Sequence, residues 1–288
     1  MLLNASGCLD ALTAPETVAQ LDGFVTKTVT PEPRPGNDPP RIAETDFGML
    51  NSIGLANPGR EAFLADYLPR YRELGRPLWI SVGGFSAGDY AETCSCLDGV
   101  AAIELNLSCP NVDEAPESAA QIVAACRAAT DLPLYAKLSP SAWDVAEVAR
   151  AVEAAGADGL SLVNTARGLA LDERTLRPRL SRGAGGYSGP ALRPIALAAV
   201  HACFRATGLP IVGMGGVRSG LDALELIACG ASAVALGTVL FAEPDAPARI
   251  RAELAEAAAA RGFSSPAEAR GIAHPSVARS GDEVPRVA

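Results

Sequence analysis

Short apolar runs alternate with amphipathic stretches along most of the chain. The runs predict buried strands at residues 2–4, 23–26, 78–82, 101–107, 134–138, 159–163, 211–214 and 233–236. The amphipathic stretches predict helices over residues 87–96, 118–130, 142–155, 191–207, 220–229 and 246–261. Strands that alternate with helices in this way are typical of parallel strands joined by right-handed crossovers.

Eight strands in a chain of 288 residues predict an α/β fold, the (β/α)8 TIM barrel, which typically takes ~250 residues. The alternative is a doubly wound open sheet, which would need a Gly-x-Gly-x-x-Gly turn after an early strand, and the sequence has none there. Two long βα-loop insertions, residues 28–58 and 166–190, are predicted as loops on the carboxyl side of the strands. We expect one domain over residues 1–271 and a loosely ordered tail over residues 272–288.

The composition limits the possible binding partners of the protein and indicates its cellular compartment. A formal net charge of −9 disfavours nucleic acid and acidic membranes as partners, although a local pocket of an acidic protein can still bind a small anion. The seven cysteines are odd in number and scattered, which is typical of reduced thiols in a cytoplasmic protein. Their spacing fits neither a zinc nor an iron–sulfur site, so we predict no metal in this chain. We also expect no signal peptide and no membrane-spanning segment.

Polar and small residues recur at the carboxyl ends of the predicted strands. Polar groups are unfavourable in a core, so their repetition at one end of a barrel predicts a shared pocket. These residues are Ala5, Ser6, Gly7, Lys27, Thr28, Asn106, Ser108, Cys109, Asn111, Lys137, Asn164, Thr165, Gly215, Gly216, Gly237 and Thr238.

The segment from Glu104 to Asn111 is the most informative of these strand ends. A buried strand runs into two asparagines, a serine, a thiol and a proline. Asn, Ser and Pro are also ordinary turn residues, so this segment alone leaves a plain turn open. The glycines at 215, 216 and 237 offer bare backbone amides ahead of short helices, which favours a phosphate, although turns use glycine pairs as well.

Lys137 lies inside the apolar run of residues 134–138, where an inward-facing lysine is rarely structural. The alternative is an outward-facing lysine whose stem lies along a helix. Lys27 poses the same question, and two lysines in one pocket suit a phosphate, a carboxylate or an electron-rich ring. Neither His201 nor His274 follows a strand, which disfavours a Ser–His–Asp or Cys–His site. A thiol with a reference pKa of ~8.5 can still act as a base at mildly alkaline pH, so Cys109 is a candidate.

Taken together, these motifs resemble the soluble (class 1) dihydroorotate dehydrogenases, which are flavin enzymes of pyrimidine synthesis. The matching segments cover residues 1–241 and are residues 4–7, 25–37, 51–55, 106–111, 136–138, 163–165, 188–190, 213–216 and 237–238. The resemblance implies a TIM barrel that binds FMN and oxidises dihydroorotate to orotate. It departs in three places: the chain starts almost at the first strand, the segment after Asn111 is short, and the tail beyond residue 242 has no match.

The resemblance also implies residue roles. Cys109 would be the general base that takes a proton from C5 of dihydroorotate while a hydride passes from C6 to N5 of FMN. Lys137 would lie near N1 and the C2 carbonyl of the flavin, and Lys27 would touch both flavin and substrate. The implied substrate contacts are Lys27, Asn51, Ile53, Gly54, Leu55, Asn106, Asn111, Asn164 and Thr165. The implied FMN contacts are Ala5, Ser6, Lys27, Thr28, Asn106, Lys137, Val163, Gly189, Gly215, Gly216, Gly237 and Thr238, the last four around the phosphate.

Within this family, residues 30–36 and 164–170 look most like the NAD-linked catalytic subunit. That resemblance implies a homodimer, which pairs with an electron-transfer subunit carrying FAD and a 2Fe–2S cluster. A fumarate-linked homodimer is the competing interpretation. Two other functions stay open: a related FMN barrel acting on another pyrimidine ring, and a non-catalytic paralogue that binds flavin or orotate.

Overall fold

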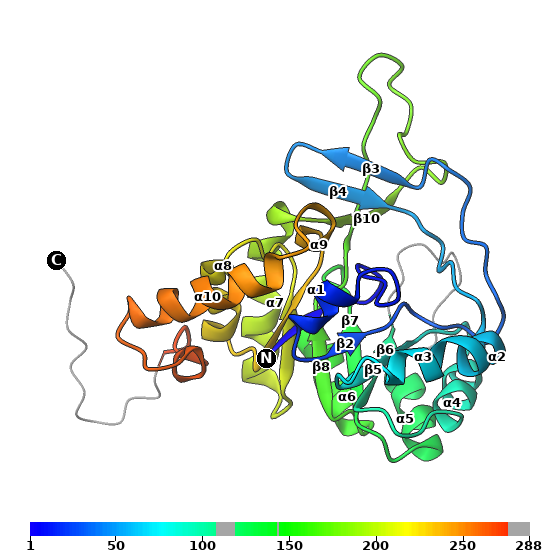
Figure 1. The fold of residues 1–288 in the computed structure, drawn as a ribbon, viewed down its shortest axis with the longest axis horizontal. Coiled ribbons are helices and arrows are strands. Elements are labelled where there is room, and N and C mark those ends of the chain that lie inside the picture. Colours follow the sequence, from blue (N-terminus) through cyan, green and yellow to red (C-terminus); the bar gives the residue numbers. More distant parts are fainter. Residues whose placement is uncertain (108–118, 143, 276–288) are drawn as a thin grey trace.

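The computed structural model describes residues 1–107, 119–142 and 144–275. Within these residues, eight parallel strands curl into a barrel in the order β1-β12-β11-β8-β7-β6-β5-β2 (Figure 1). The strands are β1 Leu2–Asn4, β2 Phe24–Val25, β5 Leu78–Val82, β6 Ala102–Asn106, β7 Leu134–Leu138, β8 Gly159–Leu162, β11 Ile211–Met214 and β12 Ala233–Leu236. The predicted barrel is confirmed, and each predicted strand ends within one or two residues of the observed one.

The inside of the barrel is filled by alternate residues of these strands. One apolar cluster joins Leu3, Val25, Trp79, Ala102, Val212, Met214, Ala233 and Ala235, with Tyr135 packed against it. Strand side chains alternate between faces, so the inward positions nearer the carboxyl ends of β6 and β7 are Glu104, Asn106 and Lys137. The alternate residues, such as Ile103 and Leu134, belong to the larger outer cluster. The inward direction predicted for Lys137 is therefore the one found.

A buried amide side chain joins β1 to β2, the two strands at the ends of the barrel order. Asn4 is fully buried, and its Nδ2 donates to the carbonyl oxygen of Val25 at 2.7 Å. The backbone nitrogen of Val25 donates to Oδ1 of Asn4 at 2.8 Å. A backbone bond from Asp22 to Leu2, at 2.9 Å, supports the same junction.

Replacing Asn4 with alanine should lower the free energy of unfolding by about 2–4 kcal/mol, because two buried backbone groups of Val25 lose their partners. Chemical denaturation measures this loss. The exposed Ser95→Ala serves as control, with a change within about 0.5 kcal/mol. A loss for Asn4→Ala no larger than the control's would show that the junction does not depend on this side chain.

Helices surround the barrel, and some of them begin with a side-chain cap. Ser86 caps α4, Asp144 caps α6, and Ser219 with Asp222 forms a capping box at α8. The helices are α1 Pro15–Ala19, α2 Arg60–Ala62, α3 Leu68–Arg72, α4 Ala87–Ser95, α5 Ala119–Ala129, α6 Val145–Ala154, α7 Arg193–Ala206, α8 Gly220–Ala228, α9 Val239–Ala242 and α10 Ala246–Ala259. A π-helical turn, Phe63–Tyr67, joins α2 to α3, and 3-10 turns lie at Pro190–Leu192 and Pro266–Ala269.

A second, four-stranded antiparallel sheet lies beyond the barrel in Figure 1, and corrects the prediction that both insertions are loops. Its order is β3-β4-β10-β9, with bounds Ile42–Thr45, Gly48–Asn51, Gly185–Ser188 and Ala166–Gly168. The central pairing joins the two insertions, Leu50 opposite Tyr187. A Cβ at Gly48 would lie 2.1 Å from the carbonyl oxygen of Ser188, so this close pairing needs glycine. β3 and β9 each pair within their own insertion, and only the β4–β10 pairing joins the two hairpins into one sheet, which local sequence patterns do not show.

The first residues of the predicted tail are packed rather than loose. Ala273 donates a backbone bond to Ala228 at 3.0 Å, and the His274 ring stacks on His201 with centroids 4.0 Å apart. Residues 273 and 274 of the predicted tail thus contact α8 and α7, and residues 276–288 lie outside the described ones. In the part of the chain that the structure describes, no helix is long and apolar enough to cross a bilayer.

Candidate active site

A cavity of about 270 Å³ opens at the carboxyl ends of the barrel strands, close to the size range of small-molecule sites. Both sheets contribute to its wall. The cavity brings together every predicted site residue that the structure describes: Ala5, Ser6, Lys27, Thr28, Asn51, Ile53, Gly54, Leu55, Asn106, Lys137, Val163, Asn164, Thr165, Gly189, Gly215, Gly216, Gly237 and Thr238. The predicted Cys109 and Asn111 lie outside the described residues.

The two lysines of the cavity are the only lysines in the whole sequence; all its other basic side chains, histidines aside, are arginines. Lys137 is 6% exposed, and its Nζ lies 3.2 Å from Oε1 of Glu104. Lys27 packs against the turn after β1, since a Cβ at Gly7 would lie 3.2 Å from its Nζ. Two cations thus face one enclosed space, which suits a ligand with negative or electron-rich edges.

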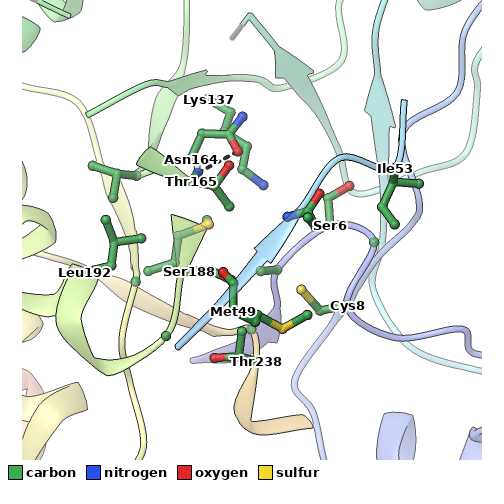
Figure 2. A pocket seen from close by; sticks show the side chains of 18 of the residues that line it. Ser6, Cys8, Met49, Ile53, Lys137, Asn164, Thr165, Ser188, Leu192 and Thr238 are labelled. Carbon is green, nitrogen blue, oxygen red and sulfur yellow. Dashed lines mark hydrogen bonds between the residues drawn. The ribbon is translucent and has the colours of Figure 1, made fainter. Parts of the chain in front are cut away.

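A chain of hydrogen bonds fixes the amide groups beside Lys137. Nδ2 of Asn164 donates to Oδ1 of Asn106 at 3.0 Å, and Nδ2 of Asn106 donates to the Thr28 hydroxyl at 3.2 Å. The backbone nitrogen of Thr165 donates to Oδ1 of Asn164 at 2.8 Å. Figure 2 shows Lys137 next to Asn164 and Thr165, with Ser6 and Cys8 elsewhere on the wall. Oriented amides of this kind can read the polar edge of a planar ring.

The turn after β4 presents backbone to the same cavity. Gly54 and Leu55 both have positive φ, 77° and 57°. Asn37 holds this turn, because its Nδ2 donates to the carbonyl of Ser52 at 2.8 Å and its backbone nitrogen to that of Ile53 at 2.9 Å. The turn is thus held in an uncommon backbone conformation beside Asn51, as a fixed cradle for an anionic group would require.

Glycines bring the backbone close to the cavity after β11. Gly215 and Gly216 have φ of 121° and 77°, a region that side chains rarely adopt. A Cβ at Gly216 would lie 2.8 Å from the backbone nitrogen of Arg193, and one at Gly215 would lie 2.9 Å from Cβ of Ala196. Bare backbone beside the pocket matches the phosphate position of such barrels.

Several residues without a role predicted from the sequence also lie at this site. Cys8, Met49, Leu192 and Met214 line the cavity, and Glu104 pairs with Lys137 beneath it. Burial raises the pKa of the Cys8 thiol, an effect that the ammonium groups of Lys137 and Lys27 oppose. Glu104 could be found from the strand pattern, because it has the same inward parity as Asn106. Across the described residues, no three His, Cys, Asp or Glu side chains gather as a metal site would need.

Comparison with known proteins agrees with the family resemblance seen in the sequence. Residues 1–257 match the family described as dihydroorotate dehydrogenase. The catalytic subunit of dihydroorotate dehydrogenase B (NAD(+)) from Listeria welshimeri is 43% identical over 256 residues, which cover 84% of each chain. Its counterpart from Latilactobacillus sakei is 48% identical over 238 residues, 78% of this chain and 77% of that one. A crystal structure of DHODH from Eimeria tenella with ferulenol has a TM-score of 0.76 at 22% identity, over 94% of this chain and 84% of that one, and shows the same fold.

Proposed function

The chain belongs to the dihydroorotate dehydrogenase family, and we propose that FMN bound in the barrel-mouth cavity accepts the electrons of its reaction. That reaction is the oxidation of dihydroorotate to orotate in pyrimidine biosynthesis. One observation supports this most: a single cavity gathers both lysines, the amide chain and the glycine turns implied by the resemblance. These groups come from strands far apart in the chain, so sequence proximity does not explain their meeting.

The chemistry of the cavity fits FMN. Gly215 and Gly216 line the cavity as bare backbone, because a Cβ at either would collide with Arg193 or Ala196, and bare backbone suits a phosphate. Met214 and Val163 give an apolar surface for a flat ring, and Lys137 gives a cation for its electron-rich edge. When bound, FMN supplies a two-electron acceptor.

Around that cofactor, the protein's own groups have separate tasks. Lys137 and Lys27 place positive charge where negative charge develops, which lowers the barrier without any rearrangement of the protein. We assign the removal of the C5 proton to Cys109, on the resemblance alone. A thiol is a workable base here because its reference pKa of ~8.5 lies near the operating pH.

Two sets of groups distinguish the substrate from other pyrimidines. The turn of Ile53, Gly54 and Leu55, with Asn51, would receive the carboxylate that uracil-like rings lack. Asn106, Asn164 and Thr165, together with Asn111, would read the polar edges of the ring. We therefore favour dihydroorotate over a simple dihydropyrimidine, because a site built to hydrogen-bond a carboxylate rejects a ligand that lacks one.

We further propose NAD as the final acceptor, reached through a second subunit that carries FAD and a 2Fe–2S cluster. The relatives named above are catalytic subunits of the NAD(+) type, which supports this choice over fumarate. We also propose that the catalytic chain is a homodimer. Purification with native neighbours, followed by turnover with NAD and with fumarate, tests the acceptor: fumarate-dependent turnover by the isolated chain would contradict it.

Gly216→Ala should weaken FMN binding at least tenfold, because the added Cβ would lie 2.8 Å from the backbone nitrogen of Arg193. That tenfold loss equals about 1.4 kcal/mol of binding free energy. Gly183→Ala is the matched control: its φ is 78°, against 77° at Gly216, and nothing lies within 4 Å of its Cβ position. Fluorescence titration of the flavin-free variants measures both. Equal affinities would place the phosphate elsewhere.

The cofactor assignment has a direct test. The purified chain, after reconstitution with FMN, should retain stoichiometric flavin through gel filtration, and denaturation should release FMN rather than FAD. A colourless protein that binds orotate but no flavin would overturn the proposal and indicate a non-catalytic orotate-binding protein.

A further inference from the structure

Glu104 is a buried carboxylate inside the barrel to which the proposed reaction gives no task. It is 1% exposed, and its Oε1 lies 3.2 Å from Nζ of Lys137, which is itself 6% exposed. The two side chains come from neighbouring strands, β6 and β7. In their pairing Asn106 is opposite Lys137, and Glu104 is opposite Tyr135, one inward position deeper. The carboxylate therefore approaches the ammonium group from the barrel interior, on the side away from the cavity mouth.

The position of this pair is unfavourable on stability grounds alone. Directly below it lies the apolar layer of Ala102, Trp79 and Tyr135, where the two rings lie 4.4 Å apart. Removing two charges from water is expensive, and a well-packed apolar pair of similar volume is often as stable or more so. A buried acid at this level therefore calls for a functional explanation.

Few negatively charged groups among the described residues around the cavity can balance the charge of Lys137. Among the described residues that line it there is no Asp or Glu. The titratable groups that face Lys137 are Glu104 on β6, Lys27 after β2 and Cys8 after β1, with Tyr135 on its own strand. Burial raises the pKa of the Cys8 thiol, so the thiol is neutral near pH 7. The negative charge that balances Lys137 is therefore that of Glu104.

We propose that Glu104 is a positioning residue that holds the Lys137 ammonium group at the cavity wall and keeps it charged before any electron arrives. This inference rests on the proposed function, because the charge matters through the flavin beside it. With Glu104 in place, Lys137 is already cationic, and reduction requires no proton transfer to this amine. Without the carboxylate, burial favours the neutral amine, which must then take up a proton when negative charge appears nearby.

The consequence is measurable as a change in proton stoichiometry. If Lys137 is neutral in the oxidised state of Glu104→Gln, each two-electron reduction takes up one proton more than in the wild type. One proton per two electrons adds about 30 mV per pH unit to the slope of midpoint potential against pH, since a tenfold change in a two-electron equilibrium is about 30 mV. We expect this steeper slope at neutral and mildly alkaline pH.

The protonation of Lys137 can be followed directly, because Lys27 and Lys137 are the only lysines in the sequence. Lysine labelled isotopically at Cε should give two side-chain signals by NMR, and Lys27→Arg identifies the one from Lys137. In flavin-free protein, the Lys137 signal of Glu104→Gln should report loss of the proton at lower pH than in the wild type. Glu104→Asp retains the charge and should remain close to the wild type. It also serves as the second variant if Glu104→Gln does not fold.

The control is Glu92→Gln, which removes a surface carboxylate paired with Arg60 and should change neither quantity. Earlier proton loss in flavin-free Glu104→Gln, with a steeper potential slope after FMN is added, supports the inference. Equal titration of Lys137 in wild type and Glu104→Gln would overturn it, as would equal slopes. If wild-type FMN is not reduced by dihydroorotate, the proposed function fails, and the flavin-free titration still decides whether Glu104 holds the charge.

Discussion

Lys137→Met is expected to slow the reduction of bound FMN by dihydroorotate about 100- to 1,000-fold, the usual effect of removing one preorganised group from a site of developing charge. Lys137 is 6% exposed and lines the cavity with Asn106 and Asn164, so little water can replace its ammonium group. Methionine has a similar length and no charge. Anaerobic stopped-flow absorbance of the flavin measures the rate.

The same change also leaves Glu104 buried without its partner, and breaking such a pair destabilises by about 3–5 kcal/mol. The double variant Lys137→Met with Glu104→Gln separates the two effects. It should regain much of the lost stability and remain slow. Arg205→Met, an exposed cation on α7, is the control for charge loss alone. If the double variant reduced FMN at the wild-type rate, Lys137 would have a structural role only.

Cys109→Ser is expected to lower turnover near neutral pH by about 10²- to 10⁴-fold, the range that a positioned general base contributes. Serine preserves the size of the side chain, but its hydroxyl is a far weaker acid than a thiol and so is rarely ionised. FMN binding should be unaffected, because the assigned task of Cys109 is proton removal. Steady-state turnover across pH, with flavin content measured on the same samples, tests this.

The control for thiol loss is Cys96→Ser, which removes an exposed thiol at the end of α4 and should retain wild-type turnover. Turnover in Cys109→Ser that rises with pH would support the base assignment, because ionised serine becomes more abundant. Turnover equal to the wild type at neutral pH would refute it and would make Cys8, a thiol that lines the cavity, the next candidate.

The barrel could be predicted because its strands carry their own signal. Runs such as residues 134–138 and 211–214 are short, apolar and bounded by turn residues, and their alternation with helices fixes the topology. The four-stranded sheet could not be predicted, because β4 pairs with β10 across more than a hundred residues and neither strand is apolar on one face. The short helices α1 and α9 lack a repeat long enough to detect.

The site could be predicted where its residues lie at the carboxyl end of a strand or just past it, since the barrel then brings them together. Lys27, Asn106 and Lys137 are of this kind. Met49 could not, because it reaches the cavity from the second sheet. Glu104 could be placed inside the barrel from its parity with Asn106, but only its ion pair with Lys137 shows why a carboxylate is tolerated there. The restriction of lysine to two positions was available in the sequence and pointed to the same pocket.

The proposed reaction requires FMN and a carboxylate-bearing dihydropyrimidine to meet in this one cavity. Anaerobic addition of dihydroorotate to the FMN-loaded wild-type chain tests that most directly, with dihydrouracil as the ligand that lacks the carboxylate. We expect dihydroorotate to bleach the visible absorbance of the flavin and dihydrouracil to leave it unchanged. A flavin that stays oxidised with dihydroorotate, or that dihydrouracil reduces equally well, would contradict the account.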